Sequence, residues 1–275
     1  HKLILNYKTI RGISQKKSFI NLFSATLFVF LIGYLCRKVN IMDNKEEFFR
    51  RREKWLKEVA IVCHNWASQD TNNPDFYVFQ SRSDIFEPEL LLIGANPGNN
   101  KKYINSESFK EKGFRDDGDL GYDSNQYIEN EFAKDWHINK PILKMFEHPE
   151  MRKKLENSVI MNVVYFNTSN ISELKKLNNG KEMIAFCVNK TEEFIDLVKP
   201  KNILFMGLDA PKWLKIKFDP IKDSVLRKDE KNFLILKKMY KNIPSYIIYH
   251  PSNKRGGFNS GESLLKKRNY FLENL

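Results

Sequence analysis

Cysteine is scarce in this chain, with Cys36, Cys63 and Cys187 as the only three among 275 residues. Three cysteines cannot build a disulfide framework, and none of them belongs to a C-x-x-C pair. We therefore expect no closed structural zinc site, no four-cysteine iron–sulfur cluster and no bound metal. Glycine and proline are also few, at 12 and 10 residues, which excludes a collagen-like or low-complexity chain.

Acidic residues are absent from the first 41 positions, although this segment carries seven Lys or Arg side chains. The whole chain has 46 Lys and Arg against 34 Asp and Glu, a formal net charge of +12. Without the seven N-terminal cations, 39 basic side chains face 34 acidic ones, so residues 42–275 carry a net charge of only +5. This balance permits nucleic-acid binding without indicating it.

Charged residues are also absent from residues 19–36, an apolar run of 18 residues between Lys16-Lys17 and Arg37-Lys38. A helix of this length covers about 27 Å, which is enough to cross the hydrocarbon core of a membrane. The run is long for a signal peptide, and no small-x-small cleavage site follows it. Two interpretations of residues 1–41 stay open: a single membrane-spanning anchor, or upstream sequence that the working protein lacks.

Residues 42–275 contain no internal repeat and no clear linker, so we expect one domain, monomeric and cytoplasmic. An amphipathic helix follows Met42, a short aromatic strand covers Phe76–Gln80, and a further helix covers Lys181–Val198. Continuous apolar runs are typical of strands that are covered on both faces. Four are present: Leu90–Gly94, Val159–Phe166, Ile203–Gly207 and Tyr246–Tyr249. The alternation of strands and helices predicts an α/β fold, a three-layer α/β/α sandwich with a central, mostly parallel, four-stranded sheet.

Polar side chains follow three of these runs. In an open parallel sheet, ligands bind beyond the carboxyl ends of the strands. The first run continues into G-A-N-P-G, the second contains Asn162 and passes through Asn167, and the last is followed by H-P-S-N from His250. Amides and a histidine at one edge indicate a neutral, hydrogen-bonding ligand rather than a metal or a polyphosphate.

These three segments resemble the motifs of the uracil-DNA glycosylase superfamily, in which a G-x-N-P-G or G-Q-D-P-Y motif comes first and an H-P-S motif comes last. The Asn in the first motif is more similar to the mismatch-specific and single-strand-selective branches than to the branch with Asp there. The segment Ile203 to Ala210 also resembles the third strand of the family, and the resemblance spans about residues 88–270. It implies a cofactor-independent DNA glycosylase that acts in base-excision repair. Such an enzyme hydrolyses the N-glycosidic bond of uracil or a related damaged base, flipped out of single- or double-stranded DNA.

The resemblance also implies roles for individual residues. Asn96 would position the water, His250 would donate a hydrogen bond to the departing base, and Asn162 would read its Watson–Crick edge. Phe109 would stack on the base, with Tyr103 and Phe114 as alternatives, and Asn167 competes with Asn162 as the base-reading amide. The resemblance further assigns substrate binding to Gly94, Ala95, Pro97 and Gly98. It assigns DNA contact to Ser252, Lys254 and Arg255.

Other interpretations stay open for each of these features. Asn96 before Pro97 is also typical of a simple turn, Asn162 of a buried structural amide, and residues 253–257 of a solvated basic loop. The chain departs from the family between Asn99 and Phe109, where N-N-K-K replaces small, apolar or aromatic residues. Two functional alternatives follow: a catalytically silent nucleic-acid-binding member of the same fold, or a hydrolase of free nucleosides or nucleotides.

Overall fold

The computed structural model describes residues 44–98, 101–103, 120, 124–129, 136–253 and 255–275. The chain divides into two compact units, residues 1–49 and residues 50–275. In the first unit the described residues, 44–49, are helical, and the apolar run at residues 19–36 lies outside the described part. Among the residues that are described, no helix has both the length and the apolar character needed to cross a membrane.

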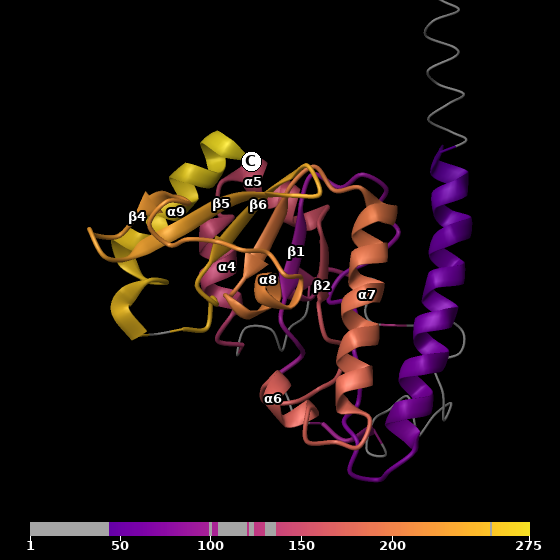
Figure 1. Cartoon of the computed structure of the whole chain (residues 1–275). Helices are drawn as coiled ribbons and strands as arrows, with labels where there is room; N and C mark the ends of the chain where they lie inside the picture. Colours follow the sequence, from indigo (N-terminus) through magenta and orange to yellow (C-terminus); the bar gives the residue numbers. More distant parts are fainter. Residues whose placement is uncertain (1–43, 99–100, 104–119, 121–123, 130–135, 254) are drawn as a thin grey trace, which may run out of the picture. The chain divides into compact units, whose positions relative to one another are not determined.

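The second unit is built on a six-stranded mixed sheet with the strand order β2-β1-β3-β6-β5-β4 (Figure 1). Four neighbouring strands run parallel, and β5 and β4 continue the sheet in antiparallel pairing. In chain order the strands are β1 (Leu91–Gly94), β2 (Val159–Asn162), β3 (Ile203–Met206), β4 (Ser224–Arg227), β5 (Phe233–Tyr240) and β6 (Ile243–Ile248). The four expected strands therefore lie together at one side of the sheet.

The expectation of a four-stranded, mostly parallel sheet is wrong, because it omits β4 and β5. The first half of β5, F-L-I-L, is an apolar and fully buried run, whereas its second half, K-K-M-Y, is largely half-exposed and polar. A two-residue turn, Lys241-Asn242, joins β5 to β6 with φ angles of 49° and 65°. Hairpin turns of this kind usually contain glycine, which is absent here, so the sequence carries no clear signal for the hairpin.

The short strand expected at Phe76–Gln80 is not part of the sheet. This segment makes isolated bridges from Phe76 to Phe166 and from Phe79 to Met161. The strand expected over Val159–Phe166 ends at Asn162, although the backbone N–H groups of Val163 and Val164 still donate to the carbonyls of Gly94, the last residue of β1, and Ala95. The polar segment after β2 thereby stays close to the loop that follows β1.

Helices flank the sheet, and residues on both of its faces are buried. Leu92, Ile160 and Leu204 belong to one buried cluster that includes side chains of the three longer helices on this face. Those helices are α4 (Asn139–Met145), α5 (Pro149–Glu156) and α9 (Gly261–Asn274). The alternate strand residues, such as Leu91 and Ile93, are also buried. These observations establish the expected α/β fold in general terms.

The remaining helices include the two predicted from the sequence, and the one expected after Met42 is confirmed by the helical residues 44–68. The helix expected at Lys181–Val198 is confirmed as α7 (Gly180–Val198). The helix over residues 50–68 packs against it, with the ring centroids of Trp55 and Phe194 4.9 Å apart. Short helical segments connect the larger elements: α3 (Gln126–Glu129), α6 (Ile171–Leu174), α8 (Asp209–Trp213) and the 3₁₀ turn η3 (Arg255–Gly257).

Candidate functional site

The carboxyl ends of four parallel strands meet at one edge of the sheet. Gly94 at the end of β1 pairs with Asn162 at the end of β2. On the other side of β1, Gly207 follows β3 and lies beside His250, which follows β6. The segments that carry the three motifs therefore lie at the same edge of the sheet, with β3 between β1 and β6, although about 150 residues separate the first from the last.

Gly94 leaves room for the side chain of Asn162. A Cβ atom at position 94 would lie 2.6 Å from Oδ1 of Asn162, closer than side-chain atoms approach one another. Asn162 is 4% exposed, and its Nδ2 has no hydrogen-bond partner within the described part of the chain. Leaving a buried donor unpaired costs about 1–3 kcal/mol, so this Nδ2 is a donor available to a ligand or a water molecule.

Asn96 is held in one orientation by the segment after β2. Its Nδ2 donates to the carbonyl oxygen of Thr168 at 2.7 Å and approaches the hydroxyl of Thr168 and the carbonyl of Pro97 at 3.2 Å. These contacts occupy the donor half of the amide and leave Oδ1 without a partner among the described residues. The side chain thus presents a fixed acceptor, which can orient a water molecule but is too weakly basic to deprotonate it beforehand.

Asn167 is a second buried amide without partners. It is 1% exposed, and neither Oδ1 nor Nδ2 makes a hydrogen bond within the described residues. Its backbone N–H donates to the carbonyl of Asp75 at 2.7 Å, and it directly precedes Thr168, which holds Asn96. Asn167 therefore remains a competitor of Asn162 for recognition of a ligand.

His250 is arranged to act as a donor. The backbone N–H of Ser252 donates to its Nδ1 at 3.3 Å, and the Ser252 hydroxyl lies 2.7 Å from the same atom. Because Nδ1 accepts, the neutral ring carries its proton on Nε2. His250 lies at the surface, yet desolvation by the protein packed around its ring lowers its pKa below the usual value, while Asp209 opposes the shift. Desolvation thus favours the neutral form of the ring.

The loop after His250 is fixed by contacts that sequence patterns did not reveal. Nδ2 of Asn259 donates to the carbonyls of His250 and Asn253 at 2.8 and 3.1 Å. The rings of Tyr249 and Phe258 stack with their centroids 4.2 Å apart. Asparagine in a loop and phenylalanine in a Phe-rich chain are too common to single out, and the contacts join residues six to nine positions apart.

Several predicted site residues lie beyond the described part or away from the edge. Phe109, Phe114 and Lys254 are outside the described residues. Tyr103 is 1% exposed and packs against Phe76, so it does not present its ring at the surface. Around Asn96, Ala95 is half-buried, Pro97 is buried and Gly98 is exposed.

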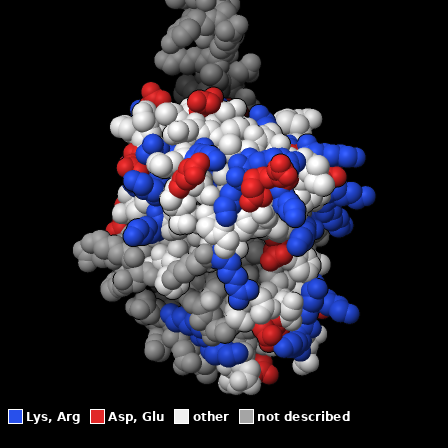
Figure 2. All heavy atoms as spheres, turned by 90° about the vertical axis from the view of Figure 1, so that its left-hand side faces the viewer, with Lys and Arg blue, Asp and Glu red and all other residues white. Residues whose placement is uncertain are grey.

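The loop and its surroundings carry both signs of charge. Figure 2 shows Lys and Arg side chains over much of the face that carries β4 and α9, with Asp and Glu among them. Arg255 is exposed on the loop, whereas Nζ of Lys228 bonds the carbonyl of Gly256. A groove of about 1220 Å³ adjoins the loop at Pro251 and Asn253 and runs between α4 and α9. Over the described residues, no three His, Cys, Asp or Glu side chains gather as metal ligands.

No family model matches this chain, and a search of curated proteins finds no match.

Proposed function

We propose that the carboxyl edge of the sheet is the active site of a DNA glycosylase that removes uracil or a related damaged base. One observation carries the proposal. Asn96, Asn162 and His250 follow or end the parallel strands β1, β2 and β6 at one edge of the sheet, and each offers a ligand a hydrogen-bonding atom with no partner among the described residues. Oδ1 of Asn96 is an acceptor, Nδ2 of Asn162 is a buried donor, and Nε2–H of His250 is a donor at the surface. The resemblance of the three motifs to the uracil-DNA glycosylase superfamily supports the same roles.

The proposed reaction is hydrolysis of the bond between the base and C1′ of the deoxyribose. A water held by Oδ1 of Asn96 bonds to C1′ through its oxygen, the glycosidic bond breaks, and its electron pair leaves with the base. The sugar is oxocarbenium-like in the transition state and the departing base carries negative charge. The proton lost by the water passes to solvent, so no strong base is required at position 96.

His250 stabilises the leaving base in this mechanism. Its Nε2–H donates to the base oxygen on which negative charge develops, and a preorganised donor of this kind is worth about 3–4 kcal/mol in the transition state. A neutral imidazole serves this role because the Ser252 contact already occupies Nδ1 and directs the remaining proton outward. The depressed pKa of His250 keeps that form dominant at pH 7.

Asn162 recognises the flipped base. Its unpaired Nδ2 is a donor for a carbonyl oxygen of uracil, and Gly94 keeps the space beside the amide open. Asn167 supplies a second amide near the loop that holds Asn96. We further propose that the enzyme works as a cytoplasmic monomer, without a metal or an organic cofactor.

The decisive experiment is a base-release assay. The full chain is incubated with end-labelled single- and double-stranded DNA containing one uracil, with and without excess EDTA, and abasic sites are then cleaved with alkali. We expect strand cleavage that requires uracil and survives EDTA. Absence of cleavage on both substrates, with binding retained, would instead support a catalytically silent nucleic-acid-binding protein.

A further inference from the structure

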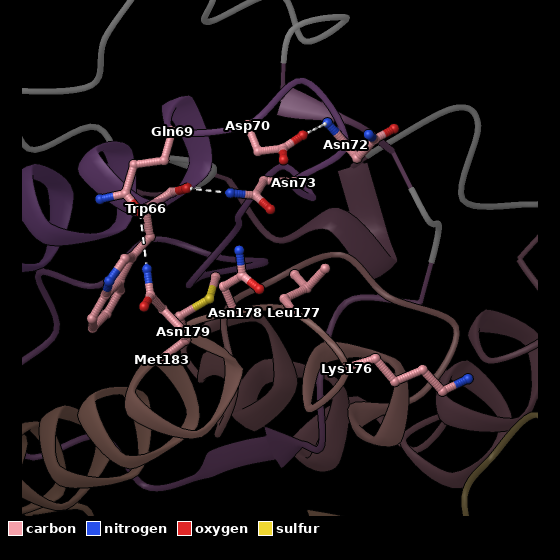
Figure 3. A pocket seen from close by; sticks show the side chains of 10 residues that line it. All are labelled: Trp66, Gln69, Asp70, Asn72, Asn73, Lys176, Leu177, Asn178, Asn179 and Met183. Atoms are coloured by element: carbon pink, nitrogen blue, oxygen red, sulfur yellow. Dashed lines mark hydrogen bonds between the residues drawn. The ribbon is translucent and has the colours of Figure 1, made fainter.

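A second cavity lies away from the strand-end residues of the proposed glycosylase site. It has a volume of about 380 Å³ and lies between the end of the helix over residues 50–68 and the turn that precedes α7. Figure 3 shows that side chains from these two segments face each other across it. Carboxamides supply half of the ten lining residues: Gln69, Asn72, Asn73, Asn178 and Asn179.

Two hydrogen bonds fix the walls of this cavity. Nδ2 of Asn179 donates to Oε1 of Gln69 at 3.0 Å, a contact between residues 110 positions apart, and Nδ2 of Asn73 donates to the carbonyl of Trp66 at 2.7 Å. Each bond uses one end of a carboxamide. Nε2 of Gln69 and the Oδ1 atoms of Asn73 and Asn179 have no partner in the described part of the chain.

The other two amides are not explained by turn formation. Asparagine is common in turns because its side chain bonds nearby backbone groups. The carboxamides of Asn72 and Asn178 make no such bond within the described residues, and Figure 3 shows that of Asn178 directed across the cavity toward Asn73. The turn itself is held by close packing, since a Cβ atom at Gly180 would lie 1.9 Å from the carbonyl oxygen of Leu174.

Few charges line the cavity. Among the described residues, Asp70 and Lys176 are the only charged ones that line it, and Nζ of Lys176 contacts both carboxylate oxygens of Glu173 at 2.8 and 2.9 Å. One carboxylate with neutral amides is a poor site for a divalent cation, and a neutralised lysine is a poor site for phosphate. Trp66, Leu177 and Met183 supply an apolar part of the wall. The lining therefore favours a neutral ligand.

We propose that this cavity binds a neutral sugar ring, either in a free carbohydrate or in the ribose of a nucleoside. Each hydroxyl group of such a ring both donates and accepts, as each carboxamide does, so the free amide atoms on opposite walls can be satisfied together. The C–H face of the ring packs on the apolar wall. The volume is within the range of small-molecule sites, and the open polar rim suits weak binding, with a Kd on the order of 1 mM.

The proposal is tested by titrating the ¹⁵N-labelled full chain with methyl β-D-glucoside, D-ribose, uridine and inorganic phosphate. We expect the side-chain NH₂ signals of Gln69, Asn178 and Asn179 to shift with neutral sugars and not with phosphate. Shifts with the glucoside identify a carbohydrate site, and shifts with only ribose and uridine identify a nucleoside site. Failure of all three neutral probes, or equal shifts with phosphate, would overturn the proposal.

Two variants separate this cavity from the edge of the sheet. Asn178→Ala removes an amide with no protein hydrogen bond, so it should leave folding unchanged and weaken sugar binding roughly three- to tenfold, the worth of one or two hydrogen bonds. Asn96→Ala should leave sugar binding unchanged, because it lies on the loop after β1. Unchanged affinity in Asn178→Ala, or lost affinity in Asn96→Ala, would place the ligand elsewhere. The result does not depend on whether the chain has glycosylase activity.

Discussion

Nζ of Lys267 donates a hydrogen bond to Oδ1 of Asn259 at 2.6 Å, and Asn259 in turn holds the carbonyl of His250. Lys267 lies on α9 with 0% of its surface exposed, and burial lowers its pKa to about 7. A buried amine is costly for a protein to keep. Here it fixes, through one amide, the loop that carries the proposed leaving-group donor.

The buried amine predicts a pH dependence of stability. In the unfolded chain Lys267 titrates near its ordinary pKa of 10.5, whereas in the folded chain its pKa is about 7. Between these values the unfolded state binds more protons, so the free energy of unfolding should rise with pH from about 7 toward 10 and be flat below 7 for this group. Urea denaturation across this pH range measures the slope.

The variant Lys267→Met should remove that part of the slope. Lys266→Met is the matched control, because Lys266 is exposed on the same helix and pairs with Glu262. Lys267→Met should also loosen the His250 loop, which would appear as a changed chemical shift of the imidazole. An identical slope in wild type and Lys267→Met would show that the amine does not titrate in this range.

Gly94→Ala should disturb Asn162 without unfolding the protein. The new methyl group would lie 2.6 Å from Oδ1 of Asn162, so the amide must move or the strands must separate, at a cost of about 1–3 kcal/mol. Gly98→Ala is the control from the same loop, since a Cβ atom there meets nothing within 4 Å. We expect thermal denaturation to show lower stability for Gly94→Ala than for Gly98→Ala, and uracil release to fall in Gly94→Ala. Equal behaviour of the two variants would contradict the close approach.

The sequence predicted which residues lie at the carboxyl edge of the sheet better than it predicted the number of strands. Motifs after buried apolar runs located Asn96, Asn162 and His250, because strand ends of a parallel sheet must share an edge. The strand β5 was missed although its first half, F-L-I-L, is an apolar run, and its lysine-rich second half carries no such signal. Contacts such as that between Lys267 and Asn259 depend on how α9 packs, and a lysine in an amphipathic helix ordinarily predicts a solvated position.

The proposed mechanism predicts that two alanine variants lose activity. Asn96→Ala removes the acceptor that orients water, and His250→Ala removes the donor to the leaving base, so each should lower turnover tenfold to a thousandfold. Single-turnover rates on uracil DNA measure the effect, and circular dichroism checks the fold. Thr168→Val is the milder comparison, because it removes only the 3.2 Å hydroxyl contact and keeps the carbonyl that holds Asn96. Unchanged rates in both alanine variants would remove these residues from the mechanism.

The exposed position of Arg255 predicts that the loop contacts DNA phosphates. Its side chain is exposed, its backbone N–H bonds Oδ1 of Asn253, and Gly256 and Gly257 follow with φ angles of 67° and 65°. If Arg255 neutralises a phosphate, Arg255→Ala should reduce the slope of log affinity against log salt by about 0.9 on duplex DNA, or about 0.7 on single strands. Lys254→Ala, at the neighbouring position, should add a similar change.

The preference for the excised base should stay the same in these variants, because phosphate contacts position a protein without reading sequence. Lys153→Ala is the control, since Lys153 is exposed on α5, which leads into the opposite edge of the sheet. If Arg255 instead fills the space left by the flipped base, binding to DNA with an abasic site should suffer less than binding to intact duplex. A wild-type salt slope and affinity on both substrates would show that Arg255 is a solvated residue of the loop with no part in DNA binding.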